Sequence, residues 1–531
     1  MSTEADKKVT KAAPGLLRSS ALVGSMTMMS RVLGLLRDVV IAATVGASAY
    51  ADAFFVAFKI PNFLRRLFAE GAFAQAFVPV LADYREQGSL NAVQALVNRV
   101  SGVLGGTLIM VTTLAVLAAP LVAGLFAPGF LGDSDKFQAT TELIRITFPY
   151  LLLISMTGFC GAILNSYGRF AVPAFTPVFL NLSLIVAALV AAPWFAEPVY
   201  ALAWGVLIAG LLQLLFQLPS LYRIDLVPRP IWDTQHPGVR RILRLMVPAL
   251  FGVSVSQINL LLDTVLASFL PTGSVSWLYY SDRLTELPLG VFGIAVATVI
   301  LPSLSAHRAG ARSEDFTLTL DWAVRMILLV AVPAAVALIL LAQPILITLF
   351  QYGALSAHDV SMASLSLQAY CLGLIAFMLI KVLAPGFYAR QDMVTPVKIG
   401  IKAMVANMLL NVAFVLPLYF YFDIGHVGLA LATSASAWLN AALLLRGLLR
   451  EGVYRFQPGW GLYLLRLLAA TAAMALAAWA LSPDLGDLQA LNWYQRALQI
   501  AVVCIGGGVA YLLAHFVLGS RFQQLRSPRV A

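Results

Sequence analysis

Long apolar segments alternate with short polar ones along nearly the whole chain, and this alternation predicts its elements. Each apolar segment can cross a bilayer, whose hydrocarbon core needs about 20 residues of α-helix. Clusters of proline, glycine and charged residues mark the boundaries. The predicted spans are residues 16–47, 51–83, 95–127, 139–166, 172–194, 199–221, 241–270, 275–305, 318–349, 360–385, 396–421, 426–448, 462–481 and 495–518. The pattern therefore predicts an all-α polytopic membrane protein with 14 transmembrane helices.

A weak internal repeat divides the chain into halves. At an offset of 223, residues 77–81 (FVPVL) align with 300–304 (ILPSL), and at a similar offset 165–169 (NSYGR) align with 386–390 (GFYAR). Chance similarity between apolar segments is the alternative. A real repeat would make spans 1–6 and 7–12 two six-helix lobes of the same orientation, a parallel pseudo-repeat. The predicted parts are an N-tail (1–15), a first lobe (16–222), a linker (223–240), a second lobe (241–448), a C-terminal helix pair (449–518) and a C-tail (519–531).

The composition agrees with a membrane protein. Hydrophobic residues make up 60% of the chain and charged residues 11%, which excludes a soluble globular protein. The net charge of +10 does not indicate nucleic-acid binding, because the basic residues are scattered between the spans. The basic N-terminus resembles a signal peptide, but the apolar segment after it is too long and carries charges. We therefore predict an uncleaved first membrane helix.

The distribution of basic residues predicts the orientation of the spans, because cytoplasmic loops are enriched in Lys and Arg. Of the 35 Lys and Arg residues, only Lys136, Arg145 and Arg496 fall in the loops that follow odd-numbered spans or near the start of the spans after them. The other loops and both tails are rich in them, especially the linker at 223–240. This asymmetry favours an even number of spans and places both termini in the cytoplasm.

Several basic residues lie inside the predicted spans: Arg31, Arg37, Lys59, Arg65, Arg66, Arg283 and Lys381. A charge at the centre of a membrane helix costs about 2.5–3.5 kcal/mol on insertion scales, so it normally faces a polar cavity or a partner. A guanidinium matches phosphate or carboxylate oxygens in pairs. We therefore predict a chamber in which a diphosphate or other polyanionic head group meets Arg31, Arg37, Arg65 and Arg283. The alternative is that these cations pair with nearby acids, namely Asp38, Asp52, Glu70, Asp282 and Glu286.

A second polar set is a candidate ion site. Asp263 in span seven, with Asn407 and Asn411 in span eleven, offers oxygen ligands to Na⁺, or Asp263 could carry a proton. The alternative is a hydrogen-bonded contact between helices.

Signatures of an enzyme are weak. There is no HExxH and no P-loop GxxxxGK[ST]. The cysteines Cys160, Cys371 and Cys504 lie in separate spans without metal-ligand spacing. We therefore predict a transporter that needs no cofactor and is driven by an ion gradient or the membrane potential.

Four segments resemble one known family. They are SRVLGLLRD (30–38), DAFFVAFKIPNFLRRLFAEGAFAQAFVPVL (52–81), GSVSWLYYSDRLTELPLGVFG (273–293) and KVLAPGFYARQDMVTPVKI (381–399). They resemble the MurJ (MviN) family of bacterial lipid II flippases, within the multidrug, oligosaccharidyl-lipid and polysaccharide exporter superfamily. The resemblance covers about Leu16 to Leu518.

The resemblance implies a function in peptidoglycan synthesis, cell-wall biogenesis and cell shape. The undecaprenyl-diphosphate-linked precursor, lipid II, would pass from the cytoplasmic to the periplasmic leaflet of the bacterial inner membrane by alternating access. Membrane lipids and cell-wall synthesis proteins are further implied partners. The last two helices would form an apolar groove for the lipid tail, and coupling to membrane potential, Na⁺ or H⁺ is left open. The family's cavity arginines fall on the four named above, and other polar positions fall on Ser30, Asp38, Asp52, Arg66, Glu70 and Glu286.

Three other functions remain open at this point. A related exporter could move another lipid-linked oligosaccharide or a drug, although an arginine-rich cavity disfavours cationic drugs. A membrane enzyme acting on polyprenyl diphosphates would need a metal or carboxylate cluster, for which Asp38, Asp52 and Glu70 are the candidates. A scaffold for cell-wall enzymes would not need the chamber arginines.

Overall fold

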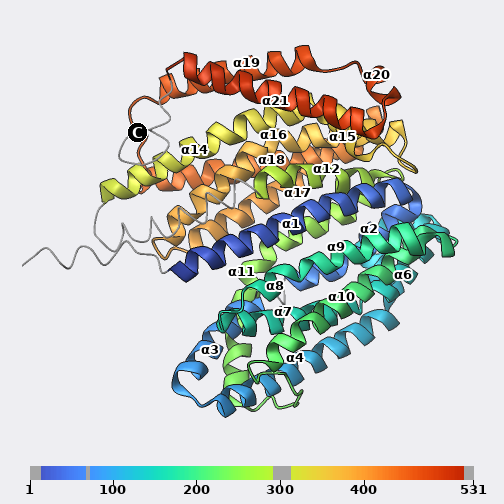
Figure 1. Cartoon of the computed structure of the whole chain (residues 1–531), viewed down its shortest axis with the longest axis vertical. Coiled ribbons are helices and arrows are strands. Elements are labelled where there is room, and N and C mark those ends of the chain that lie inside the picture. Colours follow the sequence, from blue (N-terminus) through green and yellow to red (C-terminus); the bar gives the residue numbers. More distant parts are fainter. Residues whose placement is uncertain (1–13, 67–71, 291–312, 520–531) are drawn as a thin grey trace, which may run out of the picture. The chain divides into compact units, whose positions relative to one another are not determined.

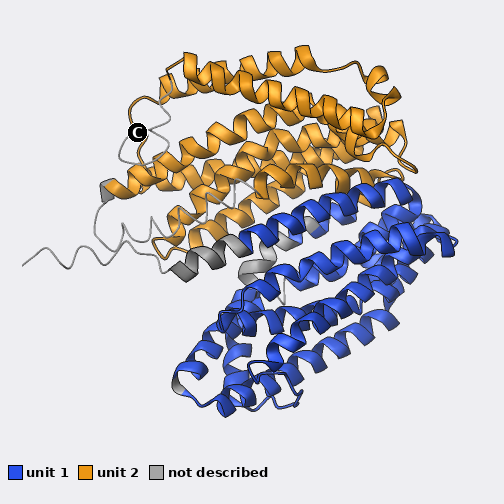
Figure 2. Cartoon of the chain, viewed as in Figure 1, with its two compact units in different colours: residues 1–265 blue, residues 266–531 orange. Residues whose placement is uncertain are grey.

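The computed structural model describes residues 14–66, 72–290 and 313–519, and every regular element in these ranges is a helix. Contacts divide the chain into two compact units, Met1–Val265 and Leu266–Ala531, which are coloured separately in Figure 2. In the described ranges, ten helical stretches are long and apolar enough to cross a membrane. The predicted fold class, an all-α polytopic membrane protein, is confirmed.

The first unit contains the helices from α1 to nearly all of α11 (Figure 1). Its elements are α1 (Pro14–Val45), α2 (Ala49–Leu64), α3 (Ala74–Gln87), α4 (Leu90–Leu117), α5 (Ala119–Phe126), η2 (Pro128–Gly132), α6 (Ser134–Thr147), α7 (Tyr150–Ser166), α8 (Ala171–Phe175), α9 (Pro177–Val186), η3 (Ala187–Ala191), η4 (Ala192–Trp194), α10 (Pro198–Tyr222) and α11 (Pro237–Ala267). Helix α1 packs on α8 and α9, α2 packs on α6, and α7 packs on α10.

The second unit contains the remaining helices (Figure 1). They are α12 (Ser274–Pro288), α14 (Ser313–Leu340), α15 (Ala342–Phe350), α16 (Ala357–Tyr388), α17 (Val394–Phe422), α18 (Gly425–Arg450), α19 (Trp460–Leu481), α20 (Leu485–Ala490) and α21 (Trp493–Val517). Its main core lies between α14, α16 and α18, where Leu320, Met378 and Leu448 are fully buried.

In the described ranges, each predicted span coincides with one helix or with a helix that is interrupted. The span at 95–127 is α4 followed by α5, and the two helices part at Ala118, shortly before Pro120. The span at 172–194 is broken at Thr176, since Pro177 has no N–H to continue α8. Residues 67–71 of span two and 291–305 of span eight lie outside the described residues. The ten apolar stretches do not include spans one, two, seven and eight, and three of these four carry the predicted chamber charges.

The first part of the predicted linker at 223–240 is bound to the first unit. Segment 223–236 lies along α4, where the Ile231 N–H donates to the Asn98 backbone oxygen at 3.0 Å. Arg99 Nε donates to Asp233 Oδ2 at 2.9 Å, and this bond holds the pKa of Asp233 below its ordinary value. The approach is close because α4 presents Gly102 there, and a side chain at Gly102 would overlap the Ile231 backbone. We call this ordered segment the strap.

The C-terminal pair, α19 and α21, is fastened to the second unit at both ends. At one end Asp321 of α14, 1% exposed, accepts hydrogen bonds at 2.8 Å from Tyr454 and Trp460 and forms an ion pair with Arg325. At the other end the guanidinium of Arg496 in α21 donates to the backbone oxygens of Ile347 and Gln351 at the end of α15. The two helices lie side by side (Figure 1).

One local feature supports the predicted repeat. The turns that follow α7 and α16 each contain a residue with positive φ, Gly168 at 73° and Gln391 at 62°. In both turns the next residue donates its N–H to the carbonyl five residues earlier, Arg169 to Leu164 and Asp392 to Phe387. The two turns are 223 residues apart, which is the offset at which residues 77–81 align with 300–304. Residues 300–304 themselves lie outside the described residues.

The predicted domain limits stay predictions. The sequence ends the first lobe at 222, whereas the contacts place nearly all of α11 with the first unit and divide the chain after Val265. Most of span seven therefore packs with the first half of the chain.

Candidate substrate-binding site

The first predicted pair of site residues is buried inside the first unit. Arg37 is 8% exposed and Asp38 2% exposed, and Arg37 donates to Asp38 Oδ1 through Nε at 2.9 Å and Nη2 at 2.7 Å. Arg37 Nη1 donates to Asn181 Oδ1 at 3.0 Å, and Asn181 Nδ2 donates to the backbone oxygen of Ser30 at 2.9 Å. The network joins α1 to α9 and includes three residues that the sequence singled out. Arg31, which directly follows Ser30 in α1, is half-buried.

Asp52 forms a buried ion pair that the sequence did not predict. Lys136 Nζ lies 2.9 Å from Asp52 Oδ2, and the two side chains are 5% and 1% exposed. The lysine also lies 4.2 Å from the centroid of the Phe130 ring. The prediction that Lys136 belongs to a loop is wrong, because α6 begins at Ser134 and Lys136 stands in its first turn. The pair joins the starts of α2 and α6.

The other charged residues of span two do not form one cluster in the described residues. Lys59 Nζ donates to Thr264 Oγ1 of α11 at 3.1 Å, so α2 is also tied to α11. Arg65 and Arg66 form a π-helical turn directly after α2, and both are half-buried. Glu70 lies outside the described residues.

The predicted site residues of the second unit form a local pair. Arg283 Nη1 donates to Glu286 Oε2 at 2.9 Å, and the side chains are 31% and 41% exposed. The guanidinium carbon of Arg283 lies 4.9 Å from the centroid of the Tyr279 ring. Both charges of this pair therefore stay partly open to a ligand or to solvent.

The candidate ion site involves residues of both units. Asp263 lies on α11 in the first unit, whereas Asn407 and Asn411 lie on α17 in the second. Asn411 Nδ2 donates to Asn407 Oδ1 at 3.0 Å, and Asn407 Nδ2 donates to Ser436 Oγ of α18 at 3.3 Å. The Asn411–Asn407 bond therefore lies within α17, and the Asn407–Ser436 bond joins α17 to α18. Among the described residues no group of three His, Cys, Asp or Glu side chains could hold a metal ion. The sodium site stays a prediction.

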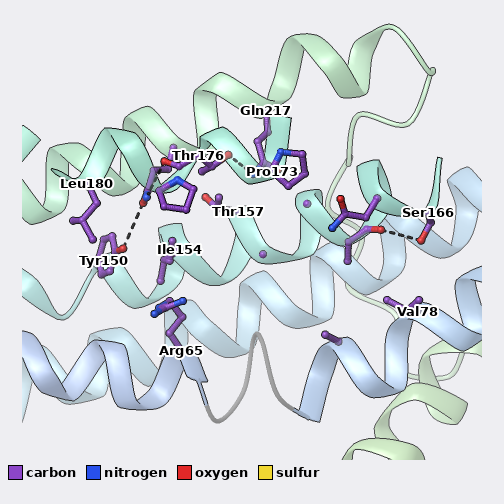
Figure 3. A pocket seen from close by; sticks show the side chains of 17 residues that line it. Arg65, Val78, Tyr150, Ile154, Thr157, Ser166, Pro173, Thr176, Leu180 and Gln217 are labelled. Atoms are coloured by element: carbon purple, nitrogen blue, oxygen red, sulfur yellow. Dashed lines mark hydrogen bonds between the residues drawn. The ribbon is translucent and has the colours of Figure 1, made fainter. Parts of the chain in front are cut away.

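A cavity of about 540 Å³ opens beside Arg65 within the first unit. Figure 3 shows the Arg65 side chain pointing toward the wall formed by α7, near Ile154 and Tyr150, with Ser166 and Val78 toward the other end. One face of α7 lines the cavity with small residues, and α8, α9 and α10 close it on another side. The lining residues are Arg65, Ala74, Val78, Tyr150, Ile154, Thr157, Gly158, Gly161, Ala162, Asn165, Ser166, Pro173, Thr176, Pro177, Leu180, Gln213 and Gln217.

Of the predicted site residues in the described ranges, Arg65 alone lines this cavity. Gln213 and Gln217 were not among the predicted site residues, although two glutamines one turn apart in the otherwise apolar α10 are a visible signal. Both are almost completely buried. The cavity therefore combines one cation with amide and hydroxyl groups.

Comparison with known proteins identifies the family. The family model described as Lipid II flippase MurJ matches residues 41–484, more than four-fifths of the chain. The chain belongs to the MurJ family. A probable lipid II flippase MurJ of Vibrio cholerae is 51% identical over 525 residues, which cover 96% of this chain and 98% of that protein. The family predicted from the four sequence segments is confirmed.

Solved structures agree with the MurJ assignment. A lipid II flippase MurJ in an inward closed conformation matches with a TM-score of 0.78 and 26% identity, covering 96% of this chain and 100% of that one. An inward-facing multidrug resistance transporter of the MATE family, from the MOP superfamily, matches with a TM-score of 0.65 and 15% identity over 82% of this chain and 98% of that one. The second likeness is one of fold alone.

Proposed function

We propose that this chain flips lipid II, the undecaprenyl-diphosphate-linked peptidoglycan precursor, from the cytoplasmic to the periplasmic leaflet of the bacterial inner membrane. The observation that carries the proposal is the match to lipid II flippases over nearly the whole length of both chains. The protein is then a transporter and not an enzyme. Alternating access moves the head group, while the lipid tail stays in the bilayer and follows the apolar surface of α19 and α21.

The proposed head-group site consists of Arg31, Arg37, Arg65 and Arg283. Arginine suits the diphosphate because its charge persists and its donors form a fork. Arg65 lines the cavity, and Arg283 is partly exposed beside Glu286. Arg37 is buried in a pair with Asp38, so its contact with the substrate requires that this pair opens during transport.

The remaining positions are proposed to support these arginines. Ser30 and Asp38 belong to the Arg37 network, Glu286 to Arg283, and Asp52 fixes α2 to α6. Arg66 and Glu70 are assigned by resemblance to the family.

Both termini are proposed to lie in the cytoplasm, because basic residues are concentrated in the tails and in the loops on that side. The return step is proposed to use the membrane potential, Na⁺ or H⁺, with Asp263, Asn407 and Asn411 as the ion site, and one elementary charge crossing 100 mV supplies about 2.3 kcal/mol.

The test is complementation of a bacterium depleted of its own flippase, with the leaflet location of lipid II assayed directly. The wild-type chain should restore growth and bring lipid II to the outer leaflet. Alanine variants of the four arginines should lose this activity at normal membrane abundance. Arg229→Ala, on the exposed strap, is the matched control and should retain it.

The outcomes separate the two parts of the proposal. If the wild-type chain at normal abundance left lipid II in the inner leaflet, the function would be refuted. If all four alanine variants restored growth, the function would stand and the head-group site would be rejected.

A further inference from the structure

The polar wall of the cavity beside Arg65 is a hydrogen-bonded network with a fixed direction. It is centred on Thr176, at the break between α8 and α9. Thr176 Oγ1 donates its only proton to the Val172 backbone oxygen at 2.8 Å, so it can only accept from Gln217 Nε2, which lies 3.1 Å away. The Thr176 backbone oxygen likewise accepts from Gln213 Nε2 at 3.3 Å. The orientation of both glutamine amides is therefore determined, because each NH₂ group faces an acceptor.

This orientation leaves an acceptor available on the cavity wall. Gln213 Oε1 accepts from the Tyr150 hydroxyl at 3.4 Å. Gln217 is only 1% exposed, so its Oε1 atom is buried. This atom accepts no hydrogen bond from any described residue. A buried carbonyl oxygen without a donor costs about 1–3 kcal/mol, so such atoms indicate a missing partner. The partner that fits Gln217 Oε1 is a hydrogen-bond donor, namely a water molecule, a ligand hydroxyl or an amide N–H.

The shape of the cavity suits a compact polar group. The face of α7 that lines it carries Gly158, Gly161 and Ala162, whose small side chains leave the space open. About 540 Å³ lies within the range of small-ligand sites, about 300–1,000 Å³. The lipid tail is excluded as an occupant, because it carries no donor for Gln217 Oε1. Arg65 disfavours a cation, and a bare anion would be repelled by the carbonyl oxygen of Gln217.

We propose that this cavity binds the sugar part of the lipid-linked head group, next to the diphosphate held by Arg65. Gln217 Oε1 accepts a hydrogen bond from a sugar hydroxyl or from an amide N–H on the sugar. The second N–H of each glutamine and the Asn165 side chain supply further polar contacts. The inference rests on the proposed function, and it makes Gln217 a specificity-determining residue that separates glycosylated from unglycosylated polyprenyl diphosphates.

The test compares two probes that share their lipid tail and diphosphate. Lipid II carries sugars and undecaprenyl diphosphate does not. The affinity of purified full-length protein for each probe is measured for the wild type and for Gln217→Met, which keeps the volume of the side chain and removes its amide. Loss of one buried hydrogen bond should weaken binding of lipid II by about tenfold. Binding of undecaprenyl diphosphate should stay unchanged.

A second series changes the volume of the cavity and leaves its polar groups in place. A Cβ at Gly161 would lie 3.5 Å from Pro173 Cβ and 3.7 Å from the Gln217 amide, an ordinary contact, so Gly161→Ala is the matched control. Gly161→Leu extends into the cavity and should weaken binding of lipid II by more than tenfold with undecaprenyl diphosphate unaffected. Thermal unfolding of each variant checks that the fold is retained.

Each outcome has one meaning. Losses restricted to lipid II support the sugar site. Equal losses for both probes, unchanged binding of lipid II in Gln217→Met and Gly161→Leu, or equal wild-type affinity for the two probes would overturn it while leaving the proposed function intact. A wild-type chain that bound no lipid II and restored no growth would overturn the proposed function together with this inference.

Discussion

The buried pair of Asp52 and Lys136 gives a prediction whose magnitude follows from the structure. The charged atoms lie 2.9 Å apart, and at an effective dielectric constant of about 20 the gross attraction is about 6 kcal/mol. Desolvation of the two ions offsets most of it, but removing one partner leaves the other charge buried and costs about 3–5 kcal/mol. Either single substitution should therefore destabilise the first unit by that amount.

The two single substitutions should not be equal. Asp52 and Lys136 both stand in the first turn of a helix, α2 and α6, where the helix dipole favours an anion and disfavours a cation. Lys136→Met leaves a carboxylate in a favourable position. Asp52→Asn leaves an ammonium in an unfavourable one, with the Phe130 ring as its remaining described contact. We expect Asp52→Asn to cost more, by about 0.5–1 kcal/mol.

The assay is a reversible denaturant titration in a lipid and detergent mixture, with the two single variants and the double variant. The double variant should be more stable than the sum of the single losses predicts, because it leaves no uncompensated charge. Additive losses, single losses below about 1 kcal/mol, or a larger loss for Lys136→Met would refute the reasoning. Transport by the stable double variant also separates packing from mechanism, since restored stability without transport would give the pair a part in the transport cycle.

Two further predictions concern the Asp321 hydrogen bonds and the contact between the strap and α4. Asp321→Ala removes the acceptor shared by Tyr454, Trp460 and the Arg325 guanidinium, so it should destabilise the docking of α19 by about 3–5 kcal/mol. Backbone hydrogen exchange should become faster in α19 and α21, and unchanged exchange there would contradict the prediction. Gly102→Val places a side chain where the Ile231 backbone lies, so the strap should detach and become sensitive to limited proteolysis between 223 and 236. Gly124→Val is the control, because a Cβ at Gly124 would have no neighbour within 4 Å.

The sequence predicts the helices of this protein well because long apolar segments, bounded by proline, glycine and charged residues, mark membrane spans. Every predicted span falls on a helix in the described ranges, and errors occur where charge obscures a helix start. Span four was predicted to begin at 139, since Lys136 and its acidic neighbours look like a loop. The lysine can be helical and buried only because Asp52, 84 residues earlier, lies against it.

The candidate site is predictable in its residue types but not in its groupings. Arginines inside apolar spans indicated a polar site, yet the sequence could not say that Arg37 would meet Asn181 of α9. It also could not say which amide atoms would remain available at Gln217, because that depends on the direction of hydrogen bonds around Thr176. Such details depend on contacts between helices that are far apart in sequence.

The fastening of α19 and α21 has a mechanical consequence. Asp321 holds the segment before α19 to α14 at one end, and Arg496 holds α21 to α15 at the other. A helix pair attached at two separate points cannot swing about either one. A displacement of α14 and α15 during a transport cycle would therefore carry α19 and α21 with it, and a spectroscopic label on the exposed face of α19 would record the displacement of these four helices.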